Sequence, residues 1–315
     1  MIKKSLSVII PCHNEEEVII ETYKILKNLI DKWSDIISSY EIIMVNNGST
    51  DKTLEKMKTI YKMDDNVIIL DLRNNFGFQG SITAGLYNAK NDMIITIDAD
   101  LQDDPHAIKD MILKHYEGFD LVLGVRKSRD KDSFFKRHSA QLYYKFLNLI
   151  GIHHAIYNHG DFRLISRSLL EDFMLYQERN RYIRGIITNL ESNYACVYYD
   201  RRERRKGKSK FNFSNLLSLA IDGITSFSAI PIRFISIFGI FTFILSIIGM
   251  LYIMYIKLVI GVDVPGWTFI VILIMLFGGI NSLFIGIIGE YIGKTYIETK
   301  RRPIFIVRKK YARKK

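Results

Sequence analysis

The sequence of 315 residues carries a formal net charge of +11, and 48% of its residues are hydrophobic. That hydrophobic fraction is high for a soluble enzyme in which 24% of the residues are charged, so composition argues against a simple soluble protein. The length accommodates one large domain or two.

Strand and helix patterns alternate along the first part of the chain. Strands are predicted at 5–11, 41–45, 66–72, 93–100 and 120–126, and helices at 15–33, 51–63, 81–90 and 106–119. Such repeated units predict an α/β fold, a mostly parallel sheet with helices on both faces. The pattern disfavours a dinucleotide-binding dehydrogenase, because no Gly-x-Gly-x-x-Gly follows the first strand.

Three polar segments follow predicted strands: PCHNEE at 11–16, NNGSTD at 46–51 and DADLQDD at 98–104. Parallel strands end at one edge of their sheet, and ligands bind in the crevice beyond those carboxyl ends. We therefore expect the three segments to meet in one crevice.

The third segment holds the most distinctive chemistry of the chain. Asp98, Asp100 and Gln102 alternate, so their side chains leave the same side of the chain while it stays extended. Two carboxylates and an amide oxygen suit Mg²⁺ or Mn²⁺, with partner phosphates completing the coordination shell. The alternative is a turn whose acids cap the next helix, and we assign Asp103 and Asp104 to that role.

The chain after these strands is rich in basic and aromatic residues. A helix is predicted at 130–151, in which aromatic residues are interleaved with Lys and Arg. This helix either packs on the sheet or lies near a membrane surface. Asp161 and Arg163 share one face of the next predicted strand, as an ion pair or as part of a site. Half of the residues at 198–211 are Lys or Arg. We interpret this segment as a loop that is either solvated or binds phosphates.

Two uncharged apolar stretches, 234–256 and 267–288, each exceed the roughly 20 residues that span a bilayer. We interpret both as transmembrane helices. A helix at 213–227, with apolar residues at intervals of three and four, is expected to lie in the membrane interface.

The residues after the second stretch are strongly basic. Between 294 and 315 there are ten Lys or Arg and one acid, Glu298, whereas the connection between the two stretches has no base after Lys257. By the positive-inside rule, the tail and the large N-terminal part lie on the cytoplasmic side of the plasma membrane. A basic run also suits nucleic acid, but beside a membrane helix we assign it to anionic lipid.

These patterns predict four parts: a cytosolic domain at 1–210, interfacial helices at 211–233, a two-helix transmembrane hairpin at 234–292 and a basic cytoplasmic tail at 293–315. Cys12 and Cys196 both belong to the cytosolic domain, where no disulfide is expected. Asn281 and the small residues around it suit helix–helix packing, which leaves the oligomeric state, including a homo-oligomer, open.

The whole series resembles the family 2 glycosyltransferases that make polyprenyl-phosphate sugars, such as dolichol-phosphate mannose synthase and bactoprenol glucosyltransferase. The similar segments are SVIIPCHNEE, IDADLQDDP, GDFRLISR, RYIRG, the R-x-E-R-x-x-G-x-S-K stretch at 201–210 and LAIDGITSFSAIPIR. A D-x-D motif alone is weak, but this series in the family order is specific.

The resemblance implies a GT-A fold and metal-dependent, inverting transfer of a sugar from a nucleotide diphosphate to a polyprenyl phosphate. It also implies that Asp100 and Gln102 contact the Mg²⁺ or Mn²⁺ ion, with Asp98 beside the ion and closer to the ribose. The residues implied for the nucleotide-sugar pocket are Pro11, Glu15, Asn47 and Asp98.

Asp161 matches the residue proposed as the catalytic base in this family. The acceptor phosphate, with a second pKa of about 6, is already an oxyanion at neutral pH, so orienting the acceptor or the sugar is an equal alternative for Asp161. The cations expected to neutralise the acceptor and donor phosphates are Arg126, Arg137, Arg201, Arg204 and Lys210.

The chain departs from the family at three positions. Asn47 stands where the family often has an aspartate that contacts the base, and because an amide donates as well as accepts, the base preference is open. Asn74 aligns with the arginine of the R-N-x-G segment, so we carry no role over to Arg73. Lys208 stands where the family usually has glutamate.

Glucose from UDP-glucose is our first expectation for the donor, followed by UDP-N-acetylglucosamine and then GDP-mannose, with undecaprenyl phosphate as acceptor and cell-envelope glycan modification as the purpose. A processive polysaccharide synthase is disfavoured, because QERNR at 177–181 lacks the tryptophan of Q-x-x-R-W and two helices cannot enclose a pore. The intact acids argue against an inactive membrane-anchored nucleotide-sugar-binding scaffold.

Overall fold

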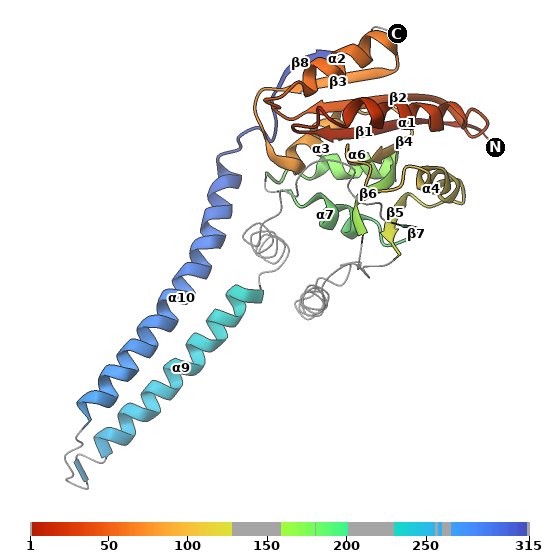
Figure 1. Ribbon diagram of the computed structural model, residues 1–315. Helices are drawn as coiled ribbons and strands as arrows, with labels where there is room; N and C mark the ends of the chain where they lie inside the picture. The colour runs from red at the N-terminus through yellow and green to blue at the C-terminus, as the bar shows by residue number, and fades with distance from the viewer. Residues whose placement is uncertain are drawn as a thin grey trace.

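The computed structural model describes residues 2–127, 159–179, 181–200, 230–255, 258–259 and 266–313. These residues form an α/β domain from which two long helices extend to one side (Figure 1). The predicted helices at 130–151 and 213–227, and most of the basic loop at 198–211, lie outside the described residues.

An eight-stranded sheet forms the centre of the described domain. Its strands are β1 (Lys4–Cys12), β2 (Ile37–Asn46), β3 (Val67–Leu72), β4 (Met93–Thr96), β5 (Leu121–Arg126), β6 (His159–Ser166), β7 (Tyr194–Tyr199) and β8 (Val307–Tyr311), in the spatial order β7-β5-β6-β4-β1-β2-β3-β8. The strand β1 pairs in parallel with β2 and β4, and β2 pairs in parallel with β3. The predicted α/β fold with a mostly parallel sheet is confirmed.

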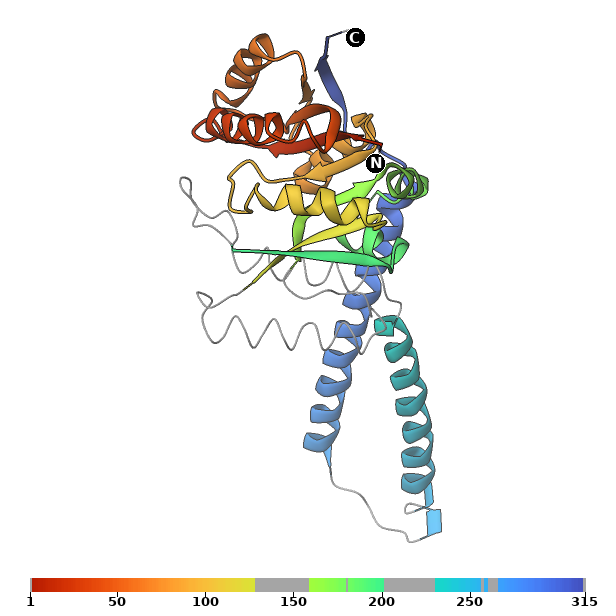
Figure 2. The same ribbon diagram turned by 90° about the vertical axis from the view of Figure 1, so that its right-hand side faces the viewer.

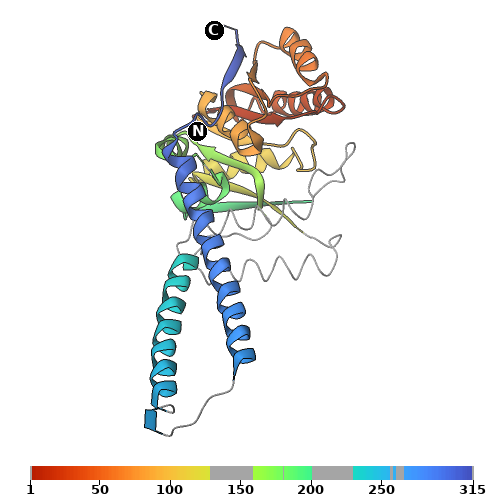
Figure 3. The same ribbon diagram turned by 90° about the vertical axis from the view of Figure 1, so that its left-hand side faces the viewer.

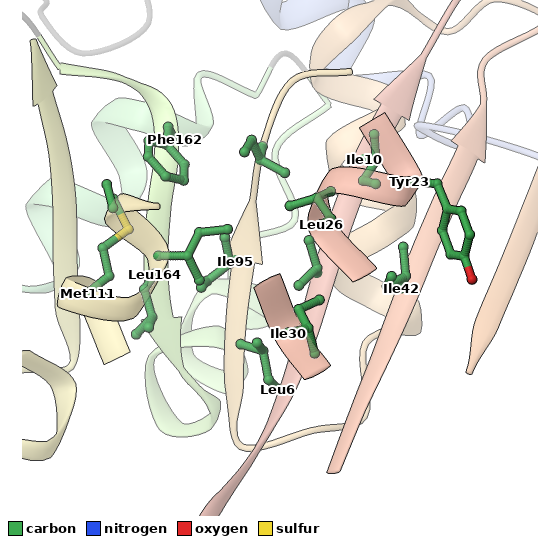
Figure 4. Packing of buried hydrophobic residues seen from close by; sticks show 14 of the residues in the cluster. Leu6, Ile10, Tyr23, Leu26, Ile30, Ile42, Ile95, Met111, Phe162 and Leu164 are labelled. Carbon is green, nitrogen blue, oxygen red and sulfur yellow. The ribbon is translucent and has the colours of Figure 1, made fainter. Parts of the chain in front are cut away.

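Helices cover both faces of this sheet. One face carries α1 (Ile19–Asp31), α2 (Thr53–Met63) and α4 (Ala107–Tyr116), and the other carries α3 (Gly77–Asn88), α6 (Arg167–Leu175) and α7 (Ile183–Leu190). Successive side chains of a strand point to opposite faces, so Val8 of β1 joins the first apolar layer and Ile9 the second. Figure 4 shows the first layer, where Leu26 and Ile30 of α1 lie over the strands.

The strand β6 is inserted antiparallel between β4 and β5, an arrangement that the strand pattern did not predict. Arg163 of β6 lies opposite Thr96, the last residue of β4. In an antiparallel pair the beginning of one strand lies beside the end of the other. The first residues of β6, including Asp161, therefore lie at the edge of the sheet where the acidic segment begins.

The two long helices are α9 (Ile230–Tyr255) and α10 (Trp267–Thr299), which run side by side away from the domain in Figures 2 and 3. The rings of Phe238 and Phe284 meet edge to face between them, with centroids 5.5 Å apart. Within the described residues, one stretch, Leu276–Thr299, is long and apolar enough to cross a membrane, and Ile237–Gly249 is a shorter apolar stretch.

The predicted boundary at residue 293 is wrong, because the basic tail is not a separate part of the molecule. The helix α10 continues to Thr299, and β8 then pairs antiparallel with β3 at the edge of the sheet. In β8 the two end residues, Val307 and Tyr311, are half-buried, while the three basic residues between them are exposed. Charged side chains are typical of edge strands, which they protect from pairing with other chains.

Candidate functional site

The ends of β1, β2 and β4 meet at one edge of the sheet. Asn47, which follows β2, donates its backbone N–H to the carbonyl of Cys12 at the end of β1, at 2.8 Å. Beyond β4, Ile97 donates to the carbonyl of Ile9 at 3.0 Å. The three polar segments predicted to share a crevice are therefore brought together.

The acidic segment turns as soon as β4 ends. Leu101 has a φ of 52°, the left-handed region that a branched side chain rarely occupies. The backbone N–H of Gln102 folds back to donate to Asp100 Oδ1 at 3.1 Å. The expectation that Asp98, Asp100 and Gln102 leave one side of an extended chain is therefore wrong, because a turn and not a strand presents Asp100 and Gln102.

Negative charge is concentrated around Asp98. Burial, followed by the charges of three neighbouring acids, raises the pKa of the Asp98 carboxyl to about 8. The three neighbours are Asp103, Asp161 and Asp100. Such a crowd of carboxylates fits a hard divalent cation, which prefers oxygen ligands and offsets their repulsion.

The described residues contain no group of three or more His, Cys, Asp or Glu side chains arranged to hold a metal ion. Asp100 and Gln102 remain the predicted ligands.

Cys12 is the last residue of β1, close to the same acids, and is 2% exposed. Burial is the main reason that the pKa of its thiol is raised, and the nearby charges of Glu15, Asp98 and Asp51 add to the effect. A thiol with a raised pKa stays protonated and is a poor nucleophile. Cys12 therefore serves packing.

Asp103 does not cap a helix, and its predicted role is wrong. Its carboxylate is buried and accepts hydrogen bonds from the hydroxyl of Tyr199 and from Arg126 Nη2, the latter at 3.1 Å. Asp104 does lie at the beginning of the helical turn, where its Oδ1 accepts from the backbone N–H of His106 at 3.2 Å. The two adjacent acids differ because Asp103 points towards β5 and β7, which supply Arg126 and Tyr199.

Asp161 is held by two arginines. Its Oδ1 forms an ion pair with Nη2 of Arg163, which is almost fully buried, and its Oδ2 accepts from Arg184 Nη2 at 3.1 Å. Burial lowers the pKa of the Arg163 guanidinium, and the charge of Asp161 opposes that effect. With both carboxylate oxygens bonded to guanidinium groups, Asp161 is held in place from two sides.

Asn47 uses its whole amide to hold the beginning of α3. Its Nδ2 donates to Asn75 Oδ1 at 3.0 Å and to the carbonyl of Gly77 at 2.9 Å, while its Oδ1 accepts from the backbone N–H of Phe76 at 2.9 Å. The side chain is 4% exposed. In this arrangement Asn47 holds the residues before α3 against the end of β2.

Gly48, next to Asn47, permits this close approach of the two loops. It has a φ of 62°, and an added Cβ would lie 2.5 Å from the backbone N of Asn75. Pro11 is buried in β1 opposite Val45, and the backbone N–H of Glu15 donates to Thr53 Oγ1 at 2.8 Å. Pro11, Glu15 and Asn47 thus lie near one another, beside the ends of β1 and β2.

Comparison with known proteins identifies the family. The sequence model of Glycosyl transferase family 2 matches residues 7–174, more than half of the chain. The chain belongs to this family. It is therefore a glycosyltransferase with the GT-A-like α/β fold, and the acidic segment and Asp161 both lie inside the matched region.

Related glycosyltransferases extend the match over the rest of the chain. The "Bactoprenol glucosyl transferase" of Shigella phage SfII is 37% identical over 308 residues, which cover 97% of this chain and 98% of that protein. The "Uncharacterized glycosyltransferase YkoT" of Bacillus subtilis (strain 168) is 42% identical over 307 residues, 96% of this chain and 90% of that protein. The likeness therefore includes the long helices.

One solved structure in the comparison is glucosyl-3-phosphoglycerate synthase from Mycobacterium tuberculosis in complex with Mn²⁺, UDP-glucose and phosphoglyceric acid. It superposes with a TM-score of 0.46 at 17% identity, covering 69% of this chain and 76% of that chain.

Of the cations predicted to bind phosphates in this glycosyltransferase, Arg126 is described and the others lie outside the described residues, namely Arg137, Arg201, Arg204 and Lys210. Arg126 is paired with Asp103, whose charge raises the pKa of the guanidinium against the effect of burial. Sequence reasoning missed Tyr199, for which no motif gave a signal. It also missed Arg184 as a partner of Asp161, although Arg184 belongs to the RYIRG segment.

Proposed function

We propose that this glycosyltransferase moves a hexose, with glucose from UDP-glucose as the first candidate, to undecaprenyl phosphate at the cytoplasmic face of the plasma membrane. The observation that carries the proposal is the group of acids around Asp98, beyond the end of β4. These acids lie at the same sheet that the chain rejoins through β8 after the long apolar helix α10. The 37% identity to the bactoprenol glucosyl transferase, along nearly the whole of both chains, supports a polyprenyl phosphate acceptor.

The place of β8 supports a two-span topology. Because β8 and β3 belong to one sheet, the chain must leave and return on the same side of the membrane, which requires an even number of crossings. The helix α9 has 26 residues and α10 has 33, and at about 1.5 Å per residue each exceeds the roughly 30 Å of a bilayer core. Two crossings by α9 and α10 satisfy this condition.

The donor diphosphate fits the acidic crevice through a divalent cation. We assign Asp100 and Gln102 as the protein ligands and Asp98 as the neighbouring acid near the ribose. A bound Mg²⁺ or Mn²⁺ supplies Lewis-acid stabilisation of the charge that develops on the leaving nucleoside diphosphate. Pro11, Glu15 and the loop supported by Asn47 would surround the base and ribose.

The reaction needs little proton transfer. An oxygen of the acceptor phosphate attacks the anomeric carbon from the side opposite the leaving group, so the bond to the nucleoside diphosphate breaks and the sugar configuration inverts. The acceptor is largely a dianion at neutral pH because its second pKa is about 6. Asp161, held by Arg163 and Arg184, is suited to orienting the acceptor or the sugar.

The metal assignment is tested by replacing Asp100 with alanine in the purified protein, with Mn²⁺, UDP-glucose and undecaprenyl phosphate. We expect a loss on the order of 10²-fold or more in kcat, because a Lewis acid contributes several kcal/mol to transition-state stabilisation. Asp104→Ala is the matched control, since the Oδ1 of Asp104 bonds the backbone N–H and the ring of His106 at the beginning of α4, and it should retain activity. Near-wild-type activity of Asp100→Ala would remove the assignment.

The donor is identified by a parallel screen of UDP-glucose, UDP-N-acetylglucosamine and GDP-mannose with the same acceptor. A preference for GDP-mannose would overturn the choice of a uridine nucleotide while leaving the reaction class intact.

A further inference from the structure

The segment that connects α6 to α7, residues 176–182, links the C-terminal end of α10 to the surroundings of Asp161. We propose that Glu298 of α10 is a positioning residue, which acts through this connecting segment to hold α7 and with it the Arg184–Asp161 pair. Asn180 lies outside the described residues, and the contacts below involve the others.

The first contact joins α10 to the connecting segment. Both carboxylate oxygens of Glu298, the penultimate residue of α10, accept the backbone N–H of Arg179, at 2.7 and 2.9 Å. Hydrogen bonds to a charged acceptor are stronger than those between neutral groups. A helix that extends far from the domain is thus bonded to a loop 119 residues earlier in the chain.

The second contact folds the connecting segment around one buried guanidinium. Arg181 is 5% exposed, and it donates to the carbonyl of Tyr176 at 2.6 Å and to the carbonyl of Glu178 at 3.0 Å. The guanidinium also lies over the rings of Tyr87 and Phe173, at 5.4 and 5.2 Å from their centroids. These bonds make the segment a compact unit, so that a displacement at Arg179 is passed on along it.

The third contact connects this unit to the catalytic side chain. The backbone N–H of Ile183, the first residue of α7, donates to Gln79 Oε1 of α3 at 3.3 Å. The next residue is Arg184, whose Nη2 donates to Asp161 Oδ2 at 3.1 Å. The arginine bonded to Asp161 is therefore only five positions after Arg179, whose amide is bonded to Glu298.

The end of α10 is itself fixed against the domain. Beyond the helix, the carbonyl of Ile306 accepts the backbone N–H of Arg73 at 2.9 Å, and the ring of Phe305 meets the ring of Tyr87 edge to face at 5.9 Å. Tyr87 therefore contacts both the residues after α10 and Arg181. The position of α10 and the position of Asp161 are therefore coupled through Tyr87 and the connecting segment.

The test compares Glu298→Ala with Glu298→Gln, which keeps an oxygen acceptor, and with Glu290→Ala, an exposed glutamate two turns earlier on α10. Hydrogen exchange is measured on peptides covering 176–187, which include the amide of Arg179 and the first turn of α7. We expect exchange there to rise about tenfold in Glu298→Ala, the equivalent of one charged hydrogen bond, less in Glu298→Gln, and not at all in Glu290→Ala.

The activity readout rests on the proposed function and is chosen to separate positioning from general stability. In Glu298→Ala we expect kcat for transfer to the lipid acceptor to fall roughly fivefold to tenfold, on the scale of one lost charged hydrogen bond, while the KM for the nucleotide sugar stays unchanged. Glu298→Gln should restore most of the rate.

Each outcome decides the proposal. Faster exchange with unchanged kcat would mean that Glu298 holds the segment without positioning Asp161. Unchanged exchange would mean that Glu298 does not hold the segment. Either result overturns the proposal. If the wild-type protein transfers no sugar, the proposed function fails. In that case, exchange in the first turn of α7, reported by the amide of Ile186 that bonds to the carbonyl of Tyr182, decides the structural claim alone.

Discussion

Arg163 carries its charge inside the protein, where it is 2% exposed, and Asp161 is the carboxylate that faces it. Replacing Asp161 with asparagine would leave the guanidinium buried without a counter-charge. We expect Asp161→Asn to lower the free energy of unfolding by about 3–5 kcal/mol, the usual cost of breaking a buried pair by removing one partner. Denaturant unfolding monitored by circular dichroism measures this loss.

The control for this change is Asp200→Asn. Asp200 has an 80% exposed side chain and an ion pair with Lys127 at 3.4 Å, and exposed pairs contribute about 0–1 kcal/mol. If Asp161→Asn unfolds at the wild-type denaturant concentration, then Asp161 is not the partner that stabilises Arg163.

Asn47→Asp tests whether this side chain supports the pocket or reads the base. A carboxylate at position 47 would face two acceptors, Asn75 Oδ1 and the carbonyl of Gly77, where the amide now donates. We expect a loss of about 1–3 kcal/mol in the free energy of unfolding, the cost of leaving buried polar groups unsatisfied, and no gain in affinity for UDP. Calorimetric binding and thermal unfolding measure the two quantities.

Asn74→Asp provides a matched change at an exposed neighbour and should leave both quantities near the wild-type values. Tighter UDP binding by Asn47→Asp with an unchanged melting temperature would instead make position 47 a base-reading residue.

Much of the acidic crevice could be predicted at the residue scale, because the acids follow a buried strand directly. The pattern could not distinguish Asp103 from Asp104, since capping and burial depend on Tyr199 and Arg126, which other strands supply. Arg184 was missed for a similar reason: it reaches Asp161 from a helix 23 residues further along the chain.

At the scale of elements, α4 contains a histidine that is buried in its neutral form. His115 is 4% exposed, its Nδ1–H donates to the carbonyl of Phe119 at 2.8 Å, and its Nε2 accepts from Lys4 Nζ at 2.9 Å. Burial is the main cause that lowers the pKa of the imidazole. The unfolded chain, with an ordinary histidine pKa of about 6.5, therefore binds this proton more readily than the folded one.

The lowered pKa of His115 makes the free energy of unfolding depend on pH. Well above pH 6.5 His115 is neutral in both states and contributes no slope, whereas below about pH 6.5 only the unfolded state binds the proton, so the free energy of unfolding falls as the pH falls. We expect His115→Gln to show a shallower decline than the wild type between about pH 6.5 and 5. Unfolding titrations across this range measure the slope, and identical slopes would contradict the account.

The elements themselves were largely predictable up to β5, where apolar strands and amphipathic helices alternate in sequence. The insertion of β6 between β4 and β5 was not, because strand order depends on pairing between distant segments. The strand β8 was not predicted for another reason. Only its two end residues are half-buried, and its three exposed basic residues are typical of a solvated tail.

At the scale of the whole molecule, the pairing of β8 with β3 requires that the proposed topology have an even number of membrane crossings. We expect a cysteine at Val264, in the connection between the long helices, to react with a membrane-impermeant thiol reagent in intact cells. A cysteine at Ala312, just beyond β8, should react only after the cells are made permeable. Labelling of position 312 from outside would contradict the shared location of the tail and the catalytic domain.

The most direct measurement of the central claim is the chemical identity of the lipid product. The purified chain is incubated with undecaprenyl phosphate and the donor selected by the screen, and the lipid and nucleotide products are analysed by mass spectrometry. We predict a lipid that carries the sugar on a single phosphate, together with one equivalent of nucleoside diphosphate. A diphosphate-linked sugar released with nucleoside monophosphate, or no lipid product with any donor, would contradict the account.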